Sequence, residues 1–108
     1  MDTRNITSLA YFKRWLADEG ATLTLTRYEI WHPEAGMAVK GFYRVTHKYE
    51  GIPRKVAKLQ TTKVALTDGS PGNEVWLDLN PASYWTFGNG KAVMKSPMVI
   101  MEYELRKD

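Results

Sequence analysis

The 108-residue sequence contains no cysteine. This absence excludes disulfides, thiolate nucleophiles, iron–sulfur clusters and zinc sites with cysteine ligands. It also removes half of the zinc deaminase signature, which needs P-C-x-x-C in addition to the H-x-E that matches His32-Pro33-Glu34. His32 and His47 are few for a catalytic zinc site, so we expect no metal and no other cofactor.

Long hydrophobic runs are missing too. No segment approaches the roughly 18 apolar residues that a membrane-spanning helix needs. The first twenty residues also lack the apolar stretch and cleavage pattern of a secretion signal. We therefore expect a cytoplasmic protein that does not bind membranes.

Catalytic and nucleotide-binding motifs are absent as well. The sequence has no G-x-S-x-G, no G-x-G-x-x-G and no G-x-x-x-x-G-K-[ST]. Glu102 and Glu104 lie two residues apart on one predicted strand face, which is typical of a solvated edge rather than of the paired carboxylates of glycoside hydrolysis. We therefore expect no catalytic residues and a protein that is not an enzyme.

The composition is that of a globular protein, with 44% hydrophobic and 25% charged residues. A chain of this length can bury one hydrophobic core without disulfides or metals. We expect a single α+β domain over residues 1–108.

The beginning of the chain predicts one amphipathic helix over about residues 5–19. Its apolar residues recur every three to four positions. They are Leu9, Phe12 and Leu16. Thr3 or Asn5 is placed to cap the start of this helix, and Gly20 is placed to end it.

From Thr22 onward, alternating apolar and polar residues predict a sheet over about residues 22–106. We expect the helix to pack on a curved, mainly antiparallel sheet of five to six strands, small-barrel-like or cystatin-like. Within the first strand, the apolar residues change from odd-numbered to even-numbered positions, which predicts a bulge or bend near Thr26 and Arg27.

Two hairpins are predicted within this sheet. Gly51 and Pro53 separate a strand at 37–49 from a third strand at 54–66, which we expect to return antiparallel beside it. Asn89-Gly90 between apolar stretches predicts a second hairpin, because a type I′ turn needs two residues with positive φ.

Positive charge is concentrated in the middle of the chain. Residues 38–63 contain seven Lys and Arg against one Glu, a net charge of +6, whereas residues 1–37 carry −1 and residues 64–108 carry −2. Cations alternating with an aromatic ring on a strand suit the binding of a polyanion or an acidic surface. The predicted binding residues are Lys40, Phe42, Arg44, Lys48, Arg54, Lys55, Lys58 and Lys63.

Three functions are compatible with this basic and aromatic face. Lysines on an exposed strand can simply be solvated and prevent aggregation. The face could bind single-stranded DNA or RNA directly through phosphate contacts and stacking. The function we favour is a protein-interaction or inhibitor domain that docks on an acidic protein surface. By analogy of size and charge alone, it could block a nucleic-acid-processing complex, as phage-encoded antidefence proteins do.

Overall fold

The computed structural model describes residues 3–33, 43–48 and 51–107, and for 32–33 and 43–48 it describes only the backbone. One α-helix, two short 3₁₀ turns and eight strands lie within these ranges. In chain order they are η1 (Thr3–Asn5), α1 (Leu9–Leu16), β1 (Ala21–Pro33), β2 (Tyr43–Lys48), β3 (Pro53–Leu59), β4 (Lys63–Thr67), β5 (Glu74–Asp78), η2 (Ala82–Tyr84), β6 (Trp85–Gly88), β7 (Lys91–Lys95) and β8 (Val99–Lys107).

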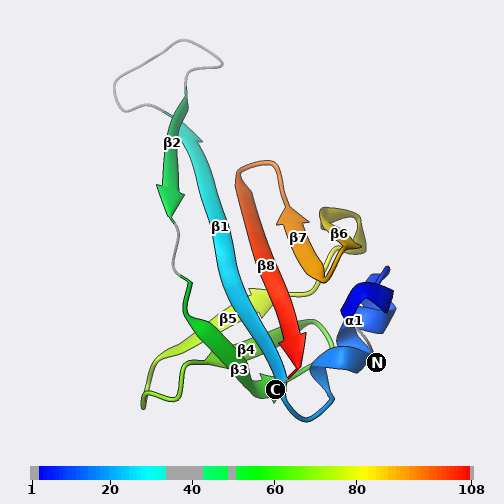
Figure 1. Ribbon diagram of the computed structural model, residues 1–108. Coiled ribbons are helices and arrows are strands. Elements are labelled where there is room, and N and C mark those ends of the chain that lie inside the picture. Colours follow the sequence, from blue (N-terminus) through cyan, green and yellow to red (C-terminus); the bar gives the residue numbers. More distant parts are fainter. Residues whose placement is uncertain (1–2, 34–42, 49–50, 108) are drawn as a thin grey trace.

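The strands form one antiparallel sheet with the long strand β1 near its middle (Figure 1). Seven strands follow one another in the order β5-β4-β3-β1-β8-β7-β6, and β2 pairs with β1 beyond the end of β3. Among the described residues the end strands β5 and β6 are not paired with each other, so the sheet is open. The predicted α+β class and antiparallel pairing are confirmed, but the predicted number of five to six strands is too low.

Helix α1 is shorter than the predicted range of 5–19. It begins after Ser8, whose Oγ accepts the backbone N–H three residues further on at 3.3 Å. Thr3 and Asn5, the predicted caps, instead form the separate turn η1. Gly20 has φ 85° and lies in the tight turn between the helix and β1, where a residue with a Cβ atom would be strained.

The hydrophobic core lies between α1 and one face of the sheet, which we call the inner face; the opposite side is the outer face. Phe12 and Trp15 of α1 are fully buried. The centroid of the Phe12 ring lies 5.4 Å from that of Trp85 and 5.2 Å from that of Phe87, so aromatic packing joins the helix to β6. The other large core side chains include Leu16, Leu23, Val64, Leu66, Leu77, Leu79 and Leu105.

The predicted irregularity in β1 is confirmed as a bulge. Pairing of β1 with β8 passes from Leu25 to Arg27 and skips Thr26. The hydroxyl of Thr26 donates to the backbone carbonyl of Glu102 at 3.2 Å and to its carboxylate at 3.0 Å. The extra residue allows Leu25 to lie in the core and Tyr28, three positions later, to pack against it.

The predicted hairpin between residues 37–49 and 54–66 is wrong for the described part of its first strand, residues 43–48, and residues 37–42 and 49 lie outside the described residues. β2 and β3 both pair with β1, one after the other along the same edge. Gly51, with φ 68°, donates its N–H to the carbonyl of Leu25 at 3.1 Å, so the chain continues along β1 instead of reversing. The reversal comes at residues 60–62, which divide the predicted third strand into β3 and β4.

The second predicted hairpin is confirmed. Asn89 and Gly90 have φ values of 54° and 74° and connect β6 to β7. The last strand, β8, then lies between β7 and β1 and pairs with both.

In the described part of the chain no helix is long and apolar enough to cross a membrane.

We expect Phe12→Ala to lower the free energy of unfolding by about 3–5 kcal/mol, because it removes a ring that packs against both Trp85 and Phe87. Tyr11→Ala is the matched control, since Tyr11 is 42% exposed on the same helix. It should change stability by less than about 1 kcal/mol. Urea unfolding followed by circular dichroism measures both, and equal losses would contradict this description of the core.

Candidate functional site

The structure divides the eight predicted binding residues into separate groups. Lys40 and Phe42 lie outside the described residues, and so do the side chains of Arg44 and Lys48, whose backbone belongs to β2. The remaining four residues lie on β3 and β4, and their side chains are described.

Three of these four side chains lie on the outer face. In the sheet, Lys55 pairs with Thr67 and Lys58 pairs with Ala65, and residues that lie directly opposite share a face. In a regular strand, two residues three positions apart would point to opposite faces. A register shift between Val56 and Lys58 places both lysines on the outer face.

Lys63 lies on the same outer face, because it begins β4 and alternates with Ala65 and Thr67. All three lysines are exposed. Three of the predicted binding residues therefore lie together as outer-face cations on two neighbouring strands.

Arg54, the fourth predicted residue, is separated from the lysines. It pairs with Leu23, whose side chain belongs to the core, and it is only 7% exposed. It therefore lies on the inner side of β3, away from the exposed lysine cluster. Its charge also acts on Asp68, whose pKa is lowered first by a hydrogen bond from the backbone N–H of Ser70 and, to a smaller extent, by Arg54.

The aromatic residue of this surface is not among the predicted binding residues. Trp76 on β5 pairs with Ala65 and is 44% exposed, and the Nζ atom of Lys63 lies 4.6 Å from the centroid of its ring. This distance is within the range of a cation–π interaction. The signal in the sequence was the alternation Glu-Val-Trp-Leu-Asp, which places the tryptophan on the outer face with two acids.

Lys58, Ala65 and Trp76 form one row across three strands, and Ala65 at its centre is fully buried. The small alanine side chain is thus covered by its larger neighbours. We call the outer surface of β3, β4 and β5 with Lys55, Lys58, Lys63 and Trp76 the lysine–tryptophan face.

Acidic residues border this face on β5. Glu74 and Asp78 lie two positions before and after Trp76, so they share its face, and both are exposed. Asp78 pairs with Lys63, and Glu74 pairs with Thr67. The lysine–tryptophan face therefore carries charges of both signs near an exposed indole, and it is not uniformly positive.

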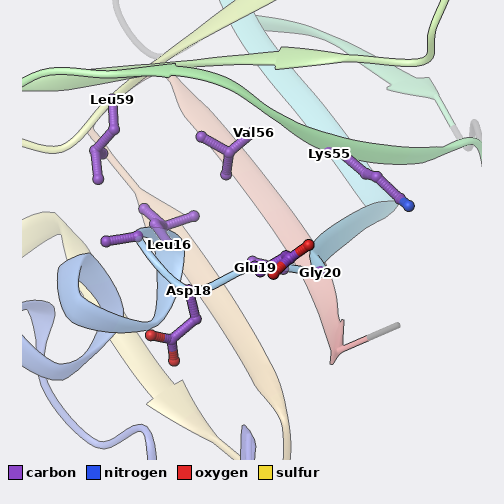
Figure 2. Close-up of a pocket in the computed structure, with 9 residues that line it drawn as sticks. Leu16, Asp18, Glu19, Gly20, Lys55, Val56 and Leu59 are labelled. Atoms are coloured by element: carbon purple, nitrogen blue, oxygen red, sulfur yellow. The ribbon is translucent and has the colours of Figure 1, made fainter.

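Two hollows lie near β3. The smaller, of about 180 Å³, borders the lysine–tryptophan face and includes Thr22, Lys55 and Thr67. The larger, of about 460 Å³, lies between the end of α1 and β3, and Figure 2 shows the side chains around it. Its labelled residues are Leu16, Val56 and Leu59, which are apolar, with Asp18, Glu19, Gly20 and Lys55 around them.

The larger hollow combines apolar side chains with two carboxylates. Asp18 and Glu19, which carry them, are exposed. Among the described residues there is no group of three or more His, Asp or Glu side chains that could hold a metal ion. The side chains of His32 and His47 lie outside the described part.

Comparison with family models, curated proteins and solved structures gave no match for this chain.

The exposure of Trp76 can be measured by fluorescence quenching. Trp15 and Trp85 are buried, so we expect acrylamide to quench mainly the emission of Trp76 and, to a smaller extent, that of the half-buried Trp31. Trp76→Phe should remove most of the quenchable emission, whereas Trp85→Phe should leave it nearly unchanged. A Trp76→Phe protein that is quenched as strongly as the wild type would contradict the exposed position of this side chain.

Proposed function

We propose that the protein is a non-enzymatic binding module that docks on a partner protein through the lysine–tryptophan face. The observation that carries this proposal is the exposed indole of Trp76 on the outer face of the end strand β5, with charged side chains on the same face. Burying an aromatic side chain of this size in a partner's pocket is a large source of binding free energy.

The charges around Trp76 favour a protein partner. Lys63 of β4 lies over the indole, Lys58 of β3 lies in the same row across the sheet, and Glu74 and Asp78 flank the indole on its own strand. An apolar anchor with a polar rim of both signs is the usual anatomy of a protein–protein interface. The matching partner surface would contain an apolar pocket with acidic groups opposite the lysines. If that pocket is the entrance of an acidic active site, binding would inhibit the partner.

Single-stranded DNA or RNA is the second candidate partner. The observation in its favour is the pairing of an exposed aromatic ring with cations, Lys63 at 4.6 Å from the ring centroid and Lys58 in the same row. Bases stack on such rings, and lysines neutralise phosphates. The carboxylates of Glu74 and Asp78 would repel a phosphate backbone beside the same ring, so we rank this function second.

The protein-partner hypothesis predicts the effect of two substitutions on partner capture. Immobilised wild-type protein should retain a partner from a native lysate of its source, and Trp76→Ala and Lys58→Glu should each lower the retained amount at least about tenfold. The tryptophan variant loses the anchor, and the lysine variant reverses a charge in the rim.

Lys95→Glu is the matched control, because it makes the same charge change at an exposed position on β7. It should retain the partner as the wild type does. Equal capture by Lys58→Glu, Trp76→Ala and Lys95→Glu would place the interface elsewhere on the molecule.

The nucleic-acid hypothesis makes a different prediction about salt. Binding of a mixed-sequence oligonucleotide should be detectable by fluorescence anisotropy at about 50 mM salt and should weaken as salt rises. Three neutralised phosphates would give a log–log slope of about −2. No binding at the lowest salt would eliminate this function, and it would leave the protein-partner hypothesis unaffected.

A further inference from the structure

Strand β5 ends the sheet and, within the described residues, pairs with β4 alone. The backbone N–H of Leu79 donates to the carbonyl of Thr62 at 2.9 Å, which extends the β4–β5 ladder by one pair. Backbone groups of successive strand residues point alternately to the two sides. Leu77 and Val75 therefore direct their N–H and C=O groups toward β4, as Leu79 does.

The other residues of β5 direct their backbone toward the open side. By the same alternation, the N–H and C=O groups of Glu74, Trp76 and Asp78 lie along the outer edge of the sheet. Trp76 thus presents both its side chain and its backbone at this edge. Such a row of groups is a template for an added strand.

Three features that usually prevent strand addition are missing from this edge. Edge strands are commonly protected by lysine, proline or a bulge, whereas β5 contains neither residue type and keeps a regular register with β4 over five pairs. Val75 and Trp76 are 38% and 44% exposed, on opposite faces of the strand. At the other end of the sheet, β6 has only four residues and its Trp85 is buried.

A second copy of β5 is a poor occupant for this edge. Antiparallel pairing of two copies about Trp76 would place Glu74 of each copy opposite Asp78 of the other. Like charges directly opposite each other destabilise a strand pair. The same two carboxylates would attract a segment with basic residues four positions apart.

We propose that β5 binds an extended segment of a partner protein as an additional antiparallel strand, with basic residues opposite Glu74 and Asp78 and apolar residues opposite Val75 and Leu77. This inference rests on the proposed function, because it specifies how a partner that contacts Trp76 is held. Main-chain hydrogen bonds supply the affinity, and the two carboxylates select the basic residues. A β-branched residue opposite Trp76 would pack against its ring.

A synthetic peptide of nine residues, Gly-Ser-Arg-Val-Thr-Val-Arg-Ser-Gly, tests this proposal directly. Amide hydrogen exchange should be fast at Glu74, Trp76 and Asp78 in the free protein and at least about tenfold slower with about 1 mM peptide. Exchange at Val75 and Leu77 should be slow in both states. A peptide with glutamate in place of both arginines should bind at least about tenfold more weakly.

Methylation of single peptide nitrogens provides the matched control. The amide of the central threonine faces β5 in the proposed register, and the amides of the two valines face away. N-methylation of the threonine should abolish binding, and N-methylation of either valine should change the affinity by less than about threefold. The folded protein is unchanged in this comparison, so loss of folding cannot explain the result.

On the protein side, Glu74→Pro is compared with Glu74→Ala. Both variants lose the carboxylate, but only proline removes the edge N–H, and it leaves the hydrogen bonds to β4 intact. Glu74→Pro should bind the arginine peptide at least about tenfold more weakly than Glu74→Ala. A circular dichroism spectrum of each variant checks the fold.

The outcomes separate this inference from the proposed function. No exchange protection at the β5 edge, or equal binding of the two kinds of methylated peptide, would overturn strand addition. The proposed function would still stand if Trp76→Ala and Lys58→Glu lower partner capture. If those two substitutions have no effect on capture, the proposed function fails, whatever the peptide does.

Discussion

The backbone ladders of β1 determine where the other elements of the sheet lie. This strand of thirteen residues pairs with β8 along one edge and with β3 and then β2 along the other. In a strand of that length without a bulge, the apolar side chains of the second half would point away from the core. The extra residue at Thr26 corrects the alternation, so that side chains before and after it reach the same core. The remaining strands extend the sheet on both sides of β1, and the helix packs on its inner face.

The parts of the fold that could be predicted are those set by local backbone chemistry. The turn at Asn89-Gly90 was predicted correctly, because few residue pairs accept two positive φ angles. The bulge near Thr26 was also predicted, because the alternation of apolar and polar residues changes there. The turn at 60–62 was missed because it contains neither glycine nor proline. A chain reversal was wrongly predicted at Gly51, because a glycine with positive φ also occurs where the chain continues along a neighbouring strand. Only the hydrogen bond from Gly51 to Leu25 distinguishes the continuation from a reversal.

The candidate site was predictable in composition but not in arrangement. Counting charges located the basic segment, yet it could not separate Arg54 from the lysines, since that depends on which partner residue lies opposite in the sheet. The bulge that aligns Lys55 with Lys58 also becomes visible only through pairing. Trp76 lies outside the basic segment in sequence and joins it through β4, which is a long-range relation that composition does not contain.

The contact between Lys63 and Trp76 has a consequence for the cost of recognition. A free lysine side chain loses about 2 kcal/mol of rotational entropy when it is fixed in an interface. Lys63 already lies over the indole ring, and both stand beside the small, buried side chain of Ala65. Part of that ordering therefore takes place when the chain folds, and the cation and the ring meet a ligand as one preformed unit.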